Sequence, residues 1–211
     1  MQKFVSLLSG GLDSPVAIYL MINKGFHPIC LSFLTSDDKS QTMKKKVIEI
    51  LKLLTKYTEN KIKIYFINHD PNLGIFKQKC DRKLTCVLCK RLMIRIAKEI
   101  GKIEGTRLIV TGDILGEQAS QTLDNLYAYN EIIEDHVLLR PLIGFNKEDV
   151  IKIDQKIGLY DAISQKSAGC LFNPQYPETH AKPHELVNAE SNLDIIEQIK
   201  SSLENAEILE F

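Results

Sequence analysis

The stretch Ser9-Gly10-Gly11-Leu12-Asp13-Ser14 has the composition of a phosphate-binding loop. It follows the short apolar run 4–8, which predicts a buried strand, and precedes residues 15–21, which predict a helix with Pro15 in its first turn. Two glycines let the backbone approach an anion closely, and the unpaired N–H groups at the start of the helix then face that anion. A glycine-rich turn capped by serine or aspartate is the simpler alternative. The loop lacks the lysine of nucleoside-triphosphate loops and the spacing of dinucleotide loops, so it predicts another kind of phosphate site.

Cysteines form the second group of residues able to do chemistry. Cys86 and Cys89 make a C-x-x-C pair at the expected start of a helix, where thiolates are favoured and two thiols can bind one metal. Together with Cys170 they could hold an iron–sulfur cluster that leaves one iron open. The residues leave three alternatives: a redox disulfide, a zinc site with Cys80 or a histidine as a further ligand, and cysteines without a role.

Lys147 stands in the first turn of a helix expected to begin after Asn146, where the helix dipole disfavours a cation. An ATP phosphate held between this helix and the loop at residues 9–14 would supply the anion that Lys147 needs. The alternative is a solvated surface lysine. Residues 112–122 are small and polar and follow an expected strand directly, which is typical of a ligand-binding loop.

Strand and helix patterns alternate along the chain and must position these residues. The predicted strands are 4–8, 28–34, 62–67, 108–111 and 137–139. The predicted helices are 15–21, 41–57, 86–101, 147–157 and a terminal helix from 195, whereas 68–85 and 172–185 are expected to be irregular. This order predicts an α/β fold with a doubly wound, mostly parallel five-stranded sheet and a C-terminal loop and helix. Ligands of such sheets bind at the carboxyl ends of the strands.

Length and composition set further bounds. The 211 residues suit one domain over 1–175 with an extension over 176–211 that packs on it. With 27 basic and 27 acidic residues, no global attraction to nucleic acid is expected. No apolar stretch approaches the roughly 18–20 residues that span a bilayer, and no signal peptide is evident, so we expect a cytoplasmic protein without a membrane partner. Five cysteines in such a protein favour metal or redox chemistry over a disulfide framework.

Several stretches, taken in order, resemble the PP-loop domain of the tRNA 4-thiouridine synthetases, a family of adenine-nucleotide α-hydrolase fold. They are residues 7–16, 91–97, 111–113, 119–123, 140–147 and 170–177. Each is modestly specific, but their order and spacing together extend over nearly the whole chain.

The resemblance implies that ATP adenylates a uridine carbonyl oxygen in tRNA, after which sulfur displaces AMP to give 4-thiouridine. It implies that Asp13 helps to hold Mg²⁺ and phosphate, that Lys147 stabilises phosphate charge, and that Cys170 handles sulfur. The residues implied to surround ATP are Leu7, Leu8, Ser9, Gly10, Gly11, Asp13, Ser14, Ser32, Phe33, Arg91, Gly112 and Gln121.

The extra pair Cys86 and Cys89 matches the archaeal-type members of the family, in which three cysteines bind an iron–sulfur cluster, here of 4Fe-4S or 3Fe-4S type with Cys170. A sulfide or persulfide donor would supply the sulfur. The sequence begins at the first PP-loop strand, so we expect a stand-alone form without the ferredoxin-like and THUMP region and without rhodanese. A separate THUMP-like subunit would then present the tRNA, and a homodimer is one assembly expected of the chain itself. Asp113 stands where relatives typically carry glutamate.

Two other classes of function fit the same loop. One is an amide- or nitrile-forming ligase that acts on a small molecule and uses its cysteines to hold zinc. The other is a nucleotide-binding regulatory module without turnover. Iron with acid-labile sulfide would favour the sulfurtransferase, and one zinc ion per chain would favour the ligase.

Overall fold

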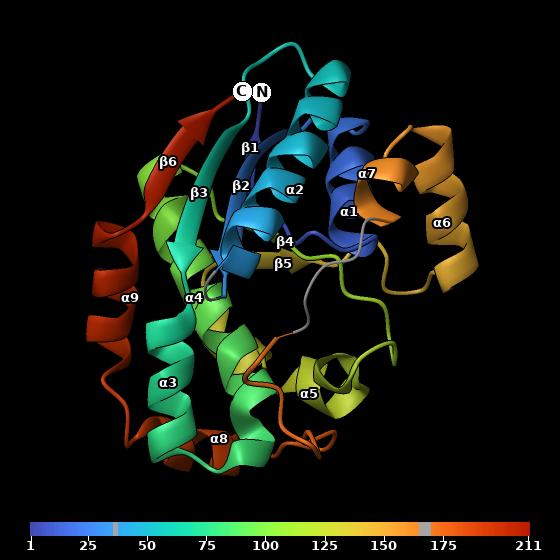
Figure 1. The fold of residues 1–211 in the computed structure, drawn as a ribbon. Helices are drawn as coiled ribbons and strands as arrows, with labels where there is room; N and C mark the ends of the chain where they lie inside the picture. Colours follow the sequence, from blue (N-terminus) through green and yellow to red (C-terminus); the bar gives the residue numbers. More distant parts are fainter. Residues whose placement is uncertain (36–37, 165–169) are drawn as a thin grey trace.

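A central sheet carries helices on both of its faces (Figure 1). The computed structural model describes residues 1–35, 38–164 and 170–211. Its sheet has the strand order β5-β4-β1-β2-β3-β6, in which β1 to β5 run parallel and β6 runs antiparallel to β3. The strands are β1 (Lys3–Leu7), β2 (His27–Leu34), β3 (Lys63–Asn68), β4 (Leu108–Val110), β5 (Val137–Leu139) and β6 (Glu207–Glu210). The chain therefore winds outward from β1 to β3 and returns to the other side of β1 as β4, which confirms the doubly wound α/β fold.

The strands β1 to β4 each contribute side chains to two separate hydrophobic cores, because successive residues of a strand point to opposite faces. In β3, Ile64 and Phe66 belong to one core, and Tyr65 and Ile67 belong to the other. The helices on the first face are α1 (Asp13–Ile22), α2 (Asp38–Leu54), α6 (Lys147–Lys156) and α7 (Tyr160–Ser164). Those on the second face are α3 (Asp70–Lys79), α4 (Thr85–Glu104), α5 (Leu123–Tyr127), α8 (Pro183–Glu190) and α9 (Ile195–Glu204).

The five predicted strands are all present, and the sheet has a sixth that the sequence did not indicate. β6 spans the four residues Glu-Ile-Leu-Glu, of which three are exposed at the sheet edge. It pairs with β3 from Lys63 opposite Glu210 to Phe66 opposite Glu207. Such a short, charged segment has no apolar pattern of its own, and its strand conformation comes from the backbone of β3.

The expected irregular segment at 68–85 is wrong for most of its length, because residues 70–79 form α3. Pro71 occupies its first turn and Gly74 its middle, and only Asn72, Leu73 and Phe76 are buried. The sequence of α3 therefore lacks the long apolar stripe that would predict a helix. α3 is instead stabilised by packing against α4, the kind of tertiary contribution that helix propensity does not reveal.

The helix expected to end near Gly101 continues to Glu104. A Cβ atom at Gly101 would lie 2.6 Å from the carbonyl oxygen of Thr106, so glycine serves close packing inside the helix. The helix ends at Gly105, whose φ of 74° is left-handed and suits a glycine C-cap.

Residues 176–211 cover the second face of the sheet with α8 and α9 and add β6 to the edge of the sheet. A buried ion-pair cluster fastens α8 to α4. Glu190 accepts hydrogen bonds from Arg91 at 2.8 and 2.9 Å and from Arg95 at 2.6 and 2.9 Å, and the Arg91 side chain is only 2% exposed. The predicted boundary between 175 and 176 stays a prediction. Within the described part of the chain, no helix is long and apolar enough to cross a membrane.

We predict that Glu190→Ala lowers the free energy of unfolding by about 3 kcal/mol, because it leaves the buried Arg91 guanidinium with only the more distant and exposed Glu131 carboxylate, at 3.6 Å. Glu99→Ala is the matched control, since Glu99 lies on α4 in an exposed pair with Lys102. The control should change stability by less than about 0.5 kcal/mol. Urea denaturation measures both, and equal effects would contradict a special role for the Glu190 cluster.

Candidate active site

The loop between β1 and α1 is held in shape by its own two serines. The Ser9 backbone N–H donates to Ser14 Oγ at 2.8 Å, and the Gly11 N–H donates to Ser9 Oγ at 3.2 Å. The two hydroxyl oxygens are 3.0 Å apart. The loop is therefore organised as a turn that leads directly into the first turn of α1, the arrangement expected of an anion cradle.

Gly112 lets the end of β4 approach the start of α1. A Cβ atom at Gly112 would lie 2.6 Å from the Ser14 nitrogen and 2.9 Å from the Asp13 carbonyl carbon. No side chain fits at that distance from backbone. The position therefore requires glycine, and the residues that follow Gly112 lie beside the cradle.

Lys147, the first residue of α6, closes the outer side of the cradle. Its Nζ lies 2.8 and 3.0 Å from the two carboxylate oxygens of Asp13 and 3.5 Å from Glu117. The Asn146 side chain caps the helix by accepting from the Asp149 N–H at 2.9 Å, which holds Lys147 at its first position. The anion that Lys147 needs at a helix N-terminus is thus the carboxylate of Asp13 in this structure.

A buried acid lies further along the same helix. Asp154 is fully buried, and neither of its carboxylate oxygens has a hydrogen-bond partner among the described residues. Burial raises the pKa of Asp154 to about 7, and the negative charge of Asp13 adds to that rise. The Asp154 carboxyl therefore holds its proton at mildly acidic pH.

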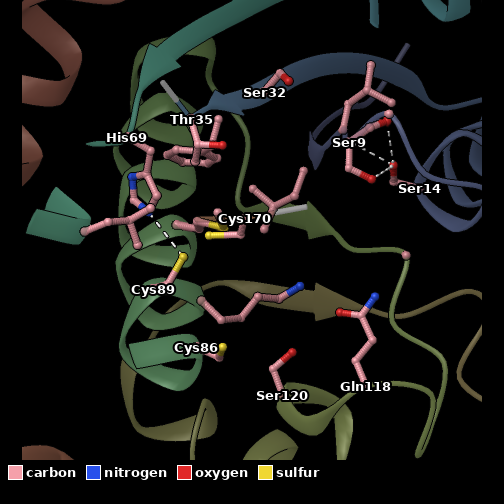
Figure 2. Close-up of a pocket in the computed structure, with 18 of the residues that line it drawn as sticks. Ser9, Ser14, Ser32, Thr35, His69, Cys86, Cys89, Gln118, Ser120 and Cys170 are labelled. Carbon is pink, nitrogen blue, oxygen red and sulfur yellow. Dashed lines mark hydrogen bonds between the residues drawn. The ribbon is translucent and has the colours of Figure 1, made fainter. Parts of the chain in front are cut away.

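One cavity of about 400 Å³ connects the cradle to the cysteines. Figure 2 shows Ser9 and Ser14 on one side of it and Cys86 and Cys89 on the other. The predicted site residues that line the cavity are Leu7, Leu8, Ser9, Gly10, Asp13, Ser14, Ser32, Phe33, Gly112, Gln121, Cys86, Cys89 and Cys170.

Three predicted residues do not line this cavity. Gly11 lies in the exposed part of the cradle loop, and Lys147 reaches the site through Asp13. Arg91 is directed to Glu190 and to the carbonyl oxygen of Ala128, so its guanidinium is already bound within the protein. A contact of Arg91 with nucleotide stays a prediction.

The three cysteines differ in their surroundings. Cys86 Sγ lies 3.3 Å from the side-chain oxygen of Asn173, Cys89 Sγ lies 3.2 Å from Nε2 of His69, and Cys170 is exposed. Burial raises the pKa of Cys86 and of Cys89, and the nearby Cys170 raises both further. Over the residues that the structure describes, no group of three or more His, Cys, Asp or Glu side chains is arranged as a metal site. The three thiols therefore share one cavity without forming a closed coordination shell.

The buried carboxylate of Asp113 contacts several polar side chains. Asp113 bonds to Lys90 at 2.8 Å, to Thr111 at 2.7 Å and to Gln121 at 3.4 Å. Burial alone would raise the pKa of Asp113, but Lys90, Thr111 and Arg140 bring it below its ordinary value. Asp113 is therefore ionised and fixes the lysine and the glutamine at the cavity wall.

His69 and Lys90 also line the cavity, although neither was a predicted site residue. Two sequence signals could have indicated them as site residues. His69 directly follows β3, at the end of the sheet where ligands bind, and Lys90 directly follows the C-x-x-C pair. Burial lowers the pKa of His69 to about 4, which makes its ring neutral at physiological pH.

Comparisons with known proteins agree with this arrangement. The family model described as ThiI, thiamine biosynthesis protein, matches residues 1–195. Proteins called probable tRNA sulfurtransferase from Methanosarcina mazei and Methanocaldococcus jannaschii are 40% and 37% identical over 98% and 92% of this chain. The chain covers 51% and 50% of those proteins, so it spans about half the length of the curated relatives it matches.

Among solved structures, a 4-thiouridine synthetase in complex with RNA and bound ATP superimposes with a TM-score of 0.92 at 26% identity. The match covers all of this chain and 55% of that one. An NMN synthetase from Francisella tularensis shares the fold at a TM-score of 0.57 and 16% identity, over 94% of this chain and 82% of that chain.

We predict that Asp154→Asn flattens the pH dependence of stability. Between about pH 4 and pH 7 the folded Asp154 keeps a proton that the unfolded chain has lost, so raising the pH destabilises the folded wild type. Relative to wild type, the variant should gain stability over this range, by roughly 2–4 kcal/mol at pH 8. Unfolding measured in urea at several pH values tests this.

Asp149→Asn is the control for Asp154, because Asp149 is exposed on the same helix and pairs only weakly with Lys152. Its difference from wild type should stay nearly constant with pH. A constant difference for Asp154→Asn as well would contradict the raised pKa.

Proposed function

This chain belongs to the ThiI family, and on that premise we propose that it uses ATP to activate a uridine in tRNA for replacement of its carbonyl oxygen by sulfur, giving 4-thiouridine. The observation that carries the proposal is the single cavity lined by both the phosphate cradle and three cysteines. Relatives called tRNA sulfurtransferases and a similar 4-thiouridine synthetase that binds RNA and ATP support it.

The first half of the reaction activates the uridine. Its carbonyl oxygen attacks the α-phosphorus of ATP, the bond to the β-phosphate breaks, and pyrophosphate leaves with the bonding electron pair. The cradle at Ser9–Ser14 would hold the phosphates at the N-terminus of α1, where backbone N–H groups and the helix dipole favour negative charge. Ser32, Phe33 and Gln121 line the cavity next to it and would contact the adenosine.

Lys147 and Asp13 would exchange partners when ATP binds. In the described structure each neutralises the other across 2.8 Å. A phosphate would take the place of the carboxylate beside Lys147, so that its ammonium group stabilises the charge that develops as pyrophosphate leaves. Asp13 would hold Mg²⁺, which supplies further charge neutralisation when bound.

The second half of the reaction delivers sulfur. The sulfur nucleophile adds to the activated carbon, and AMP leaves with the former uridine oxygen. The donor set of Cys86, Cys89 and Cys170 fits an iron–sulfur cluster, because iron in such clusters is held by thiolates. Burial and, to a smaller extent, repulsion between the cysteines raise the pKa of Cys86 and of Cys89, and a bound cation would offset both effects. When bound with three cysteines, such a cluster supplies an open iron able to carry the incoming sulfide.

The tRNA itself would be held mainly by other parts of the assembly. The 211 residues of this chain include 27 basic and 27 acidic side chains, so the chain has no overall electrostatic attraction to the RNA backbone. We propose that a THUMP-like region outside these 211 residues binds the tRNA. We predict that this region belongs to a separate subunit. This chain would then contribute the chemistry and a sulfide or persulfide donor the sulfur.

The central test is genetic. Deletion of the gene in its host should remove 4-thiouridine from tRNA, as measured by mass spectrometry of tRNA nucleosides, and the wild-type gene should restore it. Asp13→Asn and Lys147→Gln should each reduce the restored level at least about tenfold, because each removes a charge needed at the phosphates. Lys152→Gln, an exposed lysine on the same helix as Lys147, should restore it fully. An unchanged level of thionucleosides in the deletion strain would overturn the proposed function.

A second experiment tests the cluster. In anaerobically purified protein, Cys86→Ser, Cys89→Ser and Cys170→Ser should each lower bound iron and acid-labile sulfide well below wild type, since each removes one ligand. Cys80→Ser is the matched control, because Cys80 bonds to the carbonyl oxygen of Ala189 and does not line the cavity. One zinc ion per chain without sulfide would instead point to a structural zinc and contradict the cluster.

A further inference from the structure

His69 contacts Cys89, one of the three cysteines that line the cavity. It follows β3, is fully buried, and places Nε2 3.2 Å from the sulfur of Cys89 (Figure 2). Its ring packs edge-on against Phe33 with 4.8 Å between ring centroids, which restricts its rotation. His69 therefore has a defined orientation toward Cys89 from the wall of the cavity.

A chain of side-chain amides sets which nitrogen of His69 carries the proton. Gln198 of α9 donates from Nε2 to Oδ1 of Asn72 at 3.2 Å. That contact turns the Asn72 amide nitrogen toward Ser202 Oγ at 3.0 Å and toward Nδ1 of His69 at 3.4 Å. Because Asn72 presents an N–H to Nδ1, Nδ1 accepts, and the single proton of the neutral ring resides on Nε2.

We propose that His69 is a positioning residue whose Nε2–H donates a hydrogen bond to the sulfur of Cys89 and holds that sulfur ready to ligate a metal cluster. The proposal rests on the proposed function, in which Cys89 is a cluster ligand. An N–H donor stabilises negative charge on a ligating sulfur, and such outer contacts tune metal affinity and reduction potential. Gln198, Asn72 and His69 thus connect α9 to the ligand on α4.

The contact makes the three cysteines unequal. Cys86 has the side-chain oxygen of Asn173 as its neighbour, which accepts rather than donates, and Cys170 is exposed. Among the contacts described for these cysteines, only Cys89 has a side-chain N–H donor positioned by a buried network. The effect of His69 on a bound cluster should therefore act through Cys89.

The direction of the hydrogen bond is tested first in the metal-free protein. ¹⁵N NMR of histidine-labelled wild type should show the His69 Nε2 protonated and Nδ1 unprotonated, with His69→Gln used to assign the signal among the five histidines. This measurement on wild type needs neither a cluster nor activity. A ring protonated on Nδ1 would mean that Cys89 donates to His69, and would overturn the proposal.

The consequence is tested in cluster-loaded protein with a matched pair of variants. His69→Leu removes the donor and should lower the reduction potential of the cluster. It should also increase the rate of iron loss to a chelator by about tenfold or more. His69→Gln keeps an N–H able to reach the same sulfur and should remain close to wild type in both. Equal behaviour of the two variants would overturn a hydrogen-bonding role. Wild type that holds no iron would refute the cluster of the proposed function, while the NMR measurement still decides the direction of the contact.

Discussion

The close backbone contact between Gly112 and the first turn of α1 is the constraint on which the site depends. In a doubly wound sheet the strand order reverses between β1 and β4, and a crevice opens there at the carboxyl ends of the strands. Gly112 brings β4 against the Ser14 nitrogen at a distance that no side chain would permit. The loop after β4 consequently forms the wall opposite the cradle, and Asp113 and Gln121 face the same cavity as Ser9.

Helix α4 extends this geometry to the cysteines. Its first turn carries Cys86 and Cys89 into the cavity, and Lys90 bonds to Asp113 on the opposite wall. Further along the same helix, Arg91 and Arg95 bind Glu190 and fix α8. A single long helix thereby fixes the cysteines relative to the nucleotide end of the cavity, because largely buried charged contacts at Lys90, Arg91 and Arg95 hold its first half in place.

The sequence predicted the local parts of this structure well and the contacts between distant parts poorly. The strand–helix alternation, the cradle and the Asn146 cap are encoded within a few residues each, so their patterns were sufficient. α3 and β6 were missed because packing against α4 and pairing with β3 determine them. For the same reason, no pattern near residue 69 reveals that Asn72 and Gln198 would orient His69, since Gln198 is 126 positions from Asn72.

The distribution of charge around the cavity is consistent with ligand binding by exchange of partners. Lys147 is paired with Asp13 and Lys90 with Asp113, so these charges are already neutralised before any ligand enters. When a phosphate replaces Asp13 beside Lys147 and a cation replaces Lys147 beside Asp13, every charge keeps a partner. An unpaired buried charge would be costly in a low-dielectric site. Asp154 departs from this pairing, because its carboxyl group is buried without a hydrogen-bond partner among the described residues, and burial and the charge of Asp13 disfavour its ionisation. A cation bound at Asp13 would offset the charge of Asp13, so binding of the cation and ionisation of Asp154 would favour each other.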